Sequence, residues 1–351
     1  MSLDQDTLHQ LLDTIRRFVR NRLMPLEEQV ASTDQIPESV ISEMRELGLF
    51  GLTIPEEYGG LGLNTEEECK VAIELGYTSA AFRSVIGTNN GIGSQGLVMD
   101  GTDDQKENYL PRLASGEIIG SFALTEPNVG SDSANVQTKA EKDGDSYILN
   151  GTKRWITNAN IANLFTVFAR TDQSQKGSSG VSAFLVDANT PGISLSSKYK
   201  KMGQQGAHVC DVIFDNCRVP EVNIIGGPNN VNNGFKTAMK TLDRGRIHIS
   251  AFAVGCAKRL IEISTQFSLE REQFGQSISN FQMIQAMLAD SQTECYAAET
   301  MVFDAAQRRD RGEKVNLHAS CCKLYASEMV GRVADRACLL YTSPSPRDQC
   351  L

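Results

Sequence analysis

The sequence predicts a multi-domain α+β protein, with helical domains at both ends of the chain and a β-domain between them. Apolar residues recur at helical spacing in the first and last thirds of the chain, whereas from residue 121 to about residue 219 they alternate with a period of two. A length of 351 residues, 40% of them hydrophobic, is sufficient for a large core and two or three domains. The order helices, sheet, helices argues against a doubly wound nucleotide-binding fold, in which strands and helices alternate.

The N-terminal domain is expected to be helical and to cover residues 1–118. Leu11 and Ile15, among others, recur at helical spacing. The domain also holds a G-x-G-x-x-G pattern, from Gly91 to Gly96, which indicates dinucleotide binding when it lies between a strand and a helix. No strand is predicted before it, so close helix packing is the favoured explanation of these glycines.

The central β-domain is expected to be antiparallel and to cover residues 119–225. Residues 146–149 and 153–156 are predicted to form a hairpin, because the intervening pair Asn150-Gly151 suits a type I′ turn. Further strands are predicted at residues 165–169, 181–186 and 209–214.

Helical spacing returns in the C-terminal domain, expected over residues 226–338. Phe235, Ala238 and Leu242 mark one helix, and apolar residues at helical spacing between residues 284 and 302 mark another. The C-terminal domain is therefore predicted to be a helical bundle.

Composition limits the partners and the location of this chain. The formal net charge of -9 argues against binding to nucleic acid or to anionic membranes, since either needs basic clusters. No apolar run is long enough to cross a bilayer, and residues 1–6 resemble neither a signal peptide nor a mitochondrial presequence. Nine cysteines without C-x-x-C spacing fit reduced thiols. We therefore expect a cytoplasmic protein that inserts into no membrane.

No metal site is expected from the histidine and cysteine pattern. His318 lies one helical turn before Cys321 and Cys322, but a zinc site needs further ligands from elsewhere in the chain. Buried thiols in a helical core are the favoured explanation.

The most informative segment is residues 120–132, G-S-F-A-L-T-E-P-N-V-G-S-D. A β-type run breaks at Pro127 into a turn of small residues, which leaves main-chain amides and the hydroxyls of Thr125 and Ser131 free to face a polar ligand. The alternative explanation is an ordinary surface β-turn.

A second segment contains the single tryptophan of the chain. Trp155 and Thr157 place a flat apolar face and a hydroxyl two residues apart, on the same side of a strand. An isoalloxazine ring needs both an apolar wall and hydrogen-bond donors near its reactive nitrogen. The alternative for Trp155 is ordinary core packing.

Two later segments lie in the C-terminal domain. Asp243 and Arg246 are three residues apart on one helix face, a spacing that is also usual for a surface ion pair of little energetic weight. An Arg-x-x-Phe-Gly run at residues 271–275 is followed by Gln282. The planar donors of Arg271 suit phosphate oxygens.

These segments, in this order, resemble the signature of the acyl-CoA dehydrogenase family, and the loop at residues 54–62 adds to the resemblance. It implies FAD as the cofactor and an acyl-CoA as the substrate. The FAD contacts that it implies are Phe122, Leu124, Thr125, Ser131, Trp155, Thr157, Arg271, Phe274 and Gln282. The substrate contacts that it implies are Ser131, Phe235, Asp243 and Arg246. Because Arg271 and Gln282 would reach the FAD of a neighbouring subunit, the resemblance also implies a homo-oligomer, a dimer or a tetramer.

The activity implied by the resemblance is α,β-dehydrogenation of an acyl-CoA thioester to trans-2-enoyl-CoA, with electrons passed to an electron-transfer flavoprotein. Two alternatives stay open: a flavin-dependent oxidase or monooxygenase on the same scaffold, and a non-catalytic flavin or acyl-CoA binding protein. The length and branching of the acyl group cannot be read from the sequence, because pocket depth depends on how the helices pack.

The resemblance ends near Cys338, and residues 339–351 are expected to be an artefactual tail after a truncated bundle. In relatives the catalytic glutamate lies in the segment expected to be missing or, in some members, at the position of Gly245. Glu126 is expected to have a structural place in the turn. We therefore assign no catalytic residue, and we expect the chain to be inactive.

Overall fold

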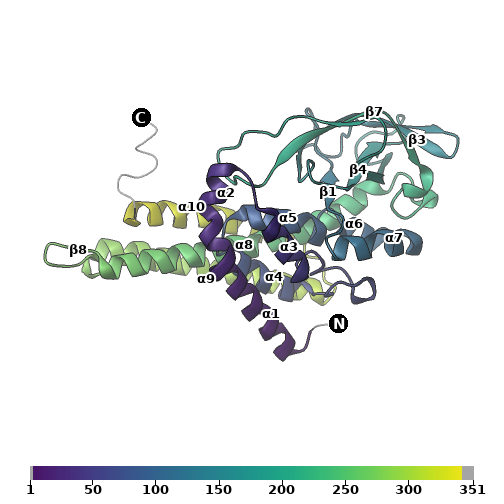
Figure 1. Ribbon diagram of the computed structural model, residues 1–351. Helices are drawn as coiled ribbons and strands as arrows, with labels where there is room; N and C mark the ends of the chain where they lie inside the picture. The colour runs from purple at the N-terminus through teal and green to yellow at the C-terminus, as the bar shows by residue number, and fades with distance from the viewer. Residues whose placement is uncertain (1–2, 342–351) are drawn as a thin grey trace. The chain divides into compact units, whose positions relative to one another are not determined.

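The computed structural model of the protein describes residues 3–341, and these residues form two compact units (Figure 1). The first unit consists of residues 26–63 and 80–242. The second consists of residues 3–25, 64–79 and 243–341.

Strands and short helices make up the first unit. Its strands are β1 (Gly120–Ala123), β2 (Lys139–Asp143), β3 (Ser146–Thr157), β4 (Leu164–Arg170), β5 (Val181–Asp187), β6 (Ile193–Leu195) and β7 (Val209–Pro220). Its helices are α2 (Glu27–Thr33), α3 (Glu38–Glu46), α5 (Ala80–Asn90), α6 (Gln95–Asp100), α7 (Asp103–Ala114) and the start of α8 (Gly234–Glu270).

The seven strands form one sheet in the order β1-β4-β2-β3-β7-β6, with β5 also paired to β4. Four pairings are antiparallel, as predicted, but β1–β4 and β2–β4 are parallel. The sheet is therefore mixed. A parallel pair needs a long crossover, and the chain between β1 and β4 supplies it by running through the β2–β3 hairpin.

The predicted hairpin at Asn150-Gly151 is wrong, because β3 runs unbroken from residue 146 to residue 157. The pair forms a bulge in this strand instead, and the register with β7 shifts between Leu149 and Gly151. Gly151 has φ +153°, and a Cβ at this position would lie 2.6 Å from the hydroxyl of Thr138. Glycine is thus required here by close backbone approach rather than by a turn.

Strand β4 lies at the centre of the first unit, since all of its residues are buried. Phe165 and Val167 belong to one apolar cluster with residues of β3 and β7, whereas Leu164 and Phe168 belong to another with residues of α6 and α7. The period-two pattern of β4 therefore fills two cores, one on each face of the sheet.

The glycines from Gly91 to Gly96 serve close packing, as predicted. Helix α5 rather than a strand leads into them. A Cβ on Gly93 would lie 3.0 Å from the carbonyl carbon of Gly120, and one on Gly96 would lie 3.0 Å from Thr237. These contacts exclude larger residues and give no support to dinucleotide binding.

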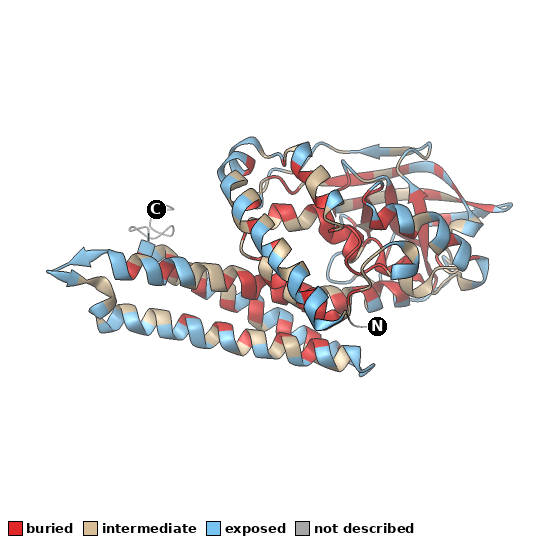
Figure 2. Ribbon diagram, turned by 60° about the horizontal axis from the view of Figure 1, so that its bottom comes forward, coloured by how far each residue is buried: buried red, intermediate tan, exposed pale blue. Residues whose placement is uncertain are grey.

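The second unit is helical. It contains α1 (Gln5–Phe18), α4 (Thr65–Leu75), the rest of α8, α9 (Gln282–Asp310), α10 (Asn316–Tyr341) and the two-residue strands β8 (Glu272–Gln273) and β9 (Gln276–Ser277). Its core repeats every three or four residues, a spacing shared by facing helices of a bundle. On α10 the buried positions are Ala319, Cys322, Ala326, Met329 and Val333. Figure 2 shows such buried stripes along the long helices.

Helix α10 continues to Tyr341 and so passes Cys338, where the tail was predicted to begin. Residues 342–351, which make up most of that predicted tail, lie outside the described residues. Within residues 3–341, no helix is both long and apolar enough to cross a membrane.

Candidate active site

The chain leaves β1 through a tight turn, residues 124–129, hereafter the 124–129 turn. The N–H of Glu126 donates to the carbonyl of Val129 at 3.0 Å, and the N–H of Val129 donates back to Glu126 at 3.1 Å. Just before the turn, the ring of Phe122 packs against an aromatic ring of β4 at 4.8 Å between centroids. Ser131, just after it, is exposed. The turn is thus fixed at its base and open at its tip.

Strand β3 holds the 124–129 turn through three hydrogen bonds. The N–H of Arg154 donates to the carbonyl of half-buried Thr125 at 2.7 Å. The Nζ of Lys153 donates to the carbonyl of Leu124 at 3.3 Å and to Oε1 of Glu126 at 2.7 Å. The main chain and a side chain of β3 therefore bind three successive residues of the turn, Leu124, Thr125 and Glu126.

Lys153 and Glu126 form an ion pair inside the protein, with side chains 0% and 3% exposed. The Glu126 carboxylate also accepts hydrogen bonds from the N–H groups of Gln137 at 2.8 Å and Thr138 at 2.9 Å. Burial lowers the pKa of Lys153 from 10.5 to about 8, against the opposing pull of Glu126. Burial raises the pKa of Glu126, but the charge of Lys153 and the hydrogen bonds from Lys153 and Thr138 together outweigh this effect and lower the pKa.

Trp155 lies in a second bulge of β3. The register with β7 shifts between Lys153 and Ile156, so that Arg154 and Trp155 both lie opposite Asp211. Trp155 has φ +56° and is 58% exposed, so the alternative of ordinary core packing is wrong for this residue. A non-glycine residue in the left-handed region costs about 1–3 kcal/mol, and such strain is concentrated at functional sites.

Asp211 stabilises the bulge from the opposite strand. Its carboxylate accepts hydrogen bonds from the N–H of Trp155 at 3.4 Å, the guanidinium of Arg154 at 3.3 Å and the hydroxyl of Tyr199 at 3.1 Å. Asp211 is buried, so these donors compensate for the lost hydration of its charge. The exposed indole is therefore carried by an ordered backbone.

Beyond Trp155, the end of β3 is fixed to its surroundings. Ile156 is buried, whereas Trp155 and Thr157 on either side of it are more exposed. The carbonyl of Thr157 accepts a hydrogen bond from the hydroxyl of Ser121 at 2.6 Å, and the amide of Asn158 donates to Thr88 of α5 at 2.9 Å.

Phe235, in the first turn of α8, is half-buried and lines a hollow of about 360 Å³. The other lining residues are Asp172, Gln175, Ser178, Ser179, Gly180, Asn232, Asn233 and Lys236. The rim is held by the buried guanidinium of Arg170, which donates to the carbonyls of Gly177 at 3.0 Å and Ser179 at 2.9 Å.

In the second unit, Asp243 and Arg246 of α8 form the ion pair that their spacing predicts. The other carboxylate oxygen of Asp243 accepts a hydrogen bond from Asn316. Gly245 lies between the paired residues and offers no carboxylate.

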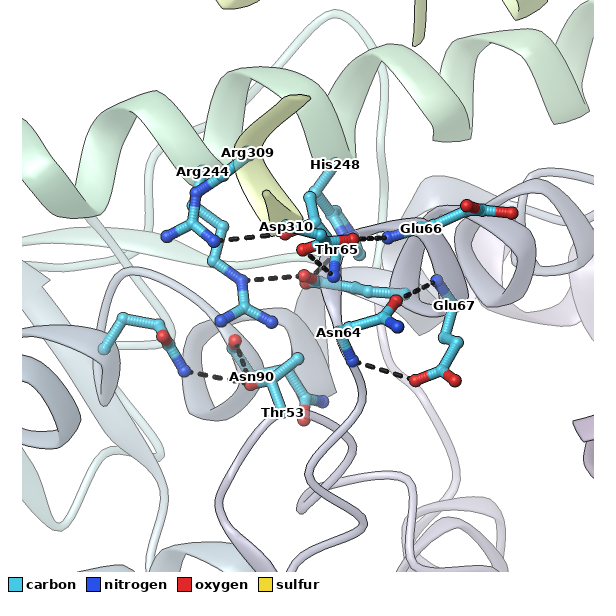
Figure 3. A network of polar contacts seen from close by, with 12 residues as sticks. Thr53, Asn64, Thr65, Glu66, Glu67, Asn90, Arg244, His248, Arg309 and Asp310 are labelled. Carbon is cyan, nitrogen blue, oxygen red and sulfur yellow. Dashed lines mark hydrogen bonds and ion pairs between the residues drawn. The ribbon is translucent and has the colours of Figure 1, made fainter. Parts of the chain in front are cut away.

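A buried charge cluster, Glu68 with Arg244 and His248, joins α4 to α8. Oε2 of Glu68 accepts a hydrogen bond from Arg244 at 2.8 Å, and Oε1 lies 2.9 Å from Nδ1 of His248. Burial raises the pKa of Glu68, but the charges of Arg244 and His248 outweigh it and lower the pKa to about 2. Figure 3 shows Arg244 and His248 beside Asp310, whose carboxylate accepts from the N–H of Thr65 at 2.9 Å.

Arg271, Phe274 and Gln282 are all exposed in the single chain. Phe274 is 92% exposed and has φ +55° at the tip of the β8–β9 hairpin. A phenyl ring held in water on a hairpin is the kind of surface that partners cover.

Sequence reasoning missed the buried charged residues that hold these elements. Lys153 and Asp211 each interrupt the apolar pattern of a strand, and this interruption is the signal that identifies them. Arg244 and His248 are four residues apart and so share one helix face, but their partner Glu68 lies 176 residues before Arg244. Local spacing cannot reveal such a partner.

Three family models match the chain in order along its length. They are described as the N-terminal, middle and C-terminal domains of acyl-CoA dehydrogenase, and they match residues 5–117, 121–217 and 232–343. Because the C-terminal model extends past Cys338, the predicted truncation of the bundle is not supported.

Individual relatives agree with the family models. The chain is 40% identical over 325 residues to a probable acyl-CoA dehydrogenase, YngJ, of Bacillus subtilis, which covers 93% of this chain and 85% of the relative. It is 37% identical over 330 residues to a 3-(aryl)acrylate reductase of Clostridium sporogenes, with 94% and 86% covered.

Solved structures have the same fold. Butyryl-CoA dehydrogenase from Megasphaera elsdenii matches with a TM-score of 0.92 at 32% identity, covering 98% of this chain and 90% of that one. A chain of a structure described as the electron transferring flavoprotein of Acidaminococcus fermentans matches with a TM-score of 0.92 at 36% identity, covering 98% and 89%.

Proposed function

The chain belongs to the acyl-CoA dehydrogenase family of FAD-dependent oxidoreductases, and from this premise we propose that it converts an acyl-CoA thioester to trans-2-enoyl-CoA. Bound FAD supplies the acceptor of the β-hydride. Electrons then pass to an electron-transferring flavoprotein, a proposal supported by the match to the structure described by that name. The protein acts in the cytoplasm.

The observation that carries this proposal is the exposed indole of Trp155 in a strained bulge next to the 124–129 turn. The donor set fits a flavin: an apolar wall, the hydroxyls of Thr125 and Thr157, and the open segment leading to Ser131. Phe122, whose ring packs against Phe168, and the buried Leu124 anchor the chain just before Thr125, and we propose both as further FAD contacts.

The thioester arm is assigned to the hollow beside Phe235. Ser131, Asp243 and Arg246 are proposed as substrate contacts from the family resemblance alone. Support comes from the size of the hollow and from its polar rim, which suits the amides of a pantetheine chain. The ion pair of Asp243 and Arg246 keeps these two side chains ordered on α8.

A second subunit is assigned to the exposed residues Arg271, Phe274 and Gln282, which would contact its FAD. Replacing Arg271 with lysine should weaken FAD retention, because lysine lacks the planar fork that binds two phosphate oxygens. The same substitution in a monomeric protein should have no effect on FAD. Sedimentation of the holoprotein, measured alongside, gives the oligomeric state.

The general base is not assigned. Glu126 is bound by Lys153 and by two main-chain N–H groups, which leaves its carboxylate structural, and Gly245 has no carboxylate. Neither residue is therefore proposed as the general base, a group that typically contributes about 100- to 10,000-fold to the rate.

Anaerobic mixing of the FAD-loaded protein with acyl-CoA substrates of increasing chain length tests the proposal. Bleaching of the flavin, followed by reoxidation on addition of an electron-transferring flavoprotein, supports it. Rapid reoxidation by air identifies an oxidase, and FAD binding without bleaching in either direction identifies a binding protein.

A second direction of reaction is favoured by the relative named as a 3-(aryl)acrylate reductase. Chemically reduced holoprotein should then be reoxidised by a 2-enoyl substrate faster than the oxidised form is bleached by the saturated one. Comparing the two half-reactions under the same conditions decides the direction.

A further inference from the structure

The proposed reaction makes no use of the buried pair Lys153 and Glu126, and yet the pair lies directly against the 124–129 turn. A buried ion pair is weak evidence for stability, because well-packed apolar residues of similar volume often serve as well. The presence of a lysine and a glutamate at these positions is therefore better explained by the chain segments that the two side chains hold in place.

The contacts of the pair all converge on one segment of chain. From β3, Lys153 reaches the carbonyl of Leu124 and the carboxylate of Glu126. The same carboxylate binds the N–H groups of Gln137 and Thr138, which follow the turn. The ion pair of Lys153 and Glu126 thus closes a loop that begins before Thr125 and ends after Ser131.

The strand that carries Lys153 also carries Trp155. The main chain of Arg154, between them, donates to the carbonyl of Thr125, so the turn and the bulge are joined by both backbone and side chain. Any shift of the turn relative to β3 would move Thr125 away from the indole.

We propose that Lys153 is a positioning residue for the flavin, which fixes the 124–129 turn on β3 so that Thr125 and Trp155 face the ring together. This inference rests on the proposed function, in which these two residues contact FAD. An apolar residue at this position could fill the space but could not bind two oxygen atoms of the turn at once.

The contacts of Lys153 with the 124–129 turn should weaken in alkaline solution. Glu126 is the charged group that acts on Lys153, and burial lowers the pKa of the lysine to about 8. The neighbouring charges Arg154 and Asp211 are paired with each other. Loss of the lysine proton removes the charge attraction to Glu126 and weakens the hydrogen bond to Leu124, so FAD affinity should fall as the pH rises through about 8.

The test compares FAD dissociation constants of the holoprotein and of Lys153→Met, measured by flavin fluorescence across this pH range. We expect Lys153→Met to bind FAD at least about tenfold more weakly below pH 8 and to lose the alkaline fall in affinity. The matched control is Lys142→Met, which removes an exposed lysine of the adjacent strand β2 together with its ion pair to Glu221. The control should bind FAD as the parent does.

A second variant keeps the inference testable if Lys153→Met does not fold. Glu126→Gln preserves the shape of the side chain and removes its charge, so the lysine should lose its proton more readily. The alkaline fall in FAD affinity should then move to lower pH. An unmoved midpoint, or a Lys153→Met protein with unchanged affinity and pH profile, overturns the inference. Failure of the parent chain to bind FAD at all would instead overturn the proposed function.

Discussion

Two buried ion clusters, one in each unit, use the same chemistry for different ends. In the second unit, Glu68 accepts contacts from Arg244 and His248, both on α8. In the first unit, Glu126 is paired with Lys153 and closes a loop of irregular chain. One cluster fixes the rotation of a long helix, whereas the other fixes a turn that carries proposed FAD contacts.

The identity of the cation decides how such a cluster responds to pH. An arginine keeps its charge at any pH that a folded protein meets, so the contact of Arg244 with Glu68 is lost only on the acid side. A buried lysine can lose its proton near neutrality, so the contact of Lys153 with Glu126 can also be released in mild alkali. Substitutions in the Lys153–Glu126 cluster should therefore affect flavin binding, and substitutions in the Glu68 cluster should affect stability.

The largest expected effect is that of Glu68→Gln. Removing the carboxylate breaks the buried ion pair of Glu68 with Arg244, and breaking a buried pair costs about 3–5 kcal/mol. Urea denaturation of the variant and the parent measures this loss.

Glu66→Gln is the matched control, because Glu66 is on the same helix but forms a partly exposed pair with Lys70. It should change the free energy of unfolding by less than about 1 kcal/mol. If both substitutions lower the free energy of unfolding by the same amount, the Glu68 cluster does not fix α8.

The second effect in size is a pH dependence of stability at both clusters, which rises with pH in an acid range at Glu68 and in an alkaline range at Lys153. The pKa of Glu68 is lowered from 4.5 to about 2, so its stabilisation is complete above pH 4.5 and is lost as the pH falls towards 2. The pKa of Lys153 is lowered from 10.5 to about 8, so its protonated form opposes folding, and this cost disappears as the pH rises from 8 to 10.5.

Melting temperatures of the FAD-free proteins, measured in acid and in alkali, check the pH dependence at both clusters. The advantage of the parent over Glu68→Gln should shrink in acid. The parent should gain stability relative to Lys153→Met in alkali, even while its FAD affinity falls. A parallel course of stability and FAD affinity above pH 8 would mean that Lys153 acts on the fold rather than on the turn.

A smaller effect is expected of Asp211→Asn. The amide can still accept hydrogen bonds from Trp155 and Tyr199, but it no longer compensates the charge of Arg154. The bulge should loosen, which the fluorescence of Trp155, the single tryptophan of the chain, reports directly. Unchanged tryptophan emission and unchanged flavin absorption would show that the bulge keeps its form without this charge.

The order of domains and most strands could be predicted because they depend on local periodicity. Strand β5, Val181–Asp187, includes all of the strand predicted at residues 181–186. The hairpin predicted at Asn150-Gly151 was wrong, because a local turn signal cannot show that β7 pairs with both halves of β3. Tertiary pairing overrode the turn preference at that point.

The residues of the candidate site also divide into those that the sequence could indicate and those that it could not. Thr125, Trp155 and Asp243 belong to motifs that are contiguous in sequence, so the resemblance could propose them as site residues. Lys153 and Glu68 act through partners far along the chain, and their burial is a property of the folded protein. A sequence indicates that a charge interrupts an apolar pattern, but not which opposite charge meets it.

The smallest effect on stability, and the sharpest on the flavin, is expected of Thr157→Val. The two side chains have nearly the same shape, and the carbonyl of Thr157, which binds Ser121, is unaffected. Denaturation should therefore differ by less than about 1 kcal/mol from the parent. If the hydroxyl donates to the flavin, its loss should shift the absorption bands or the reduction potential of bound FAD. The comparison with Lys153→Met is informative, because that variant should weaken FAD binding whereas Thr157→Val should alter the properties of FAD that remains bound. A Thr157→Val protein with parental spectrum and potential would place the hydroxyl outside hydrogen-bonding reach of the ring and leave the flavin wall to Trp155.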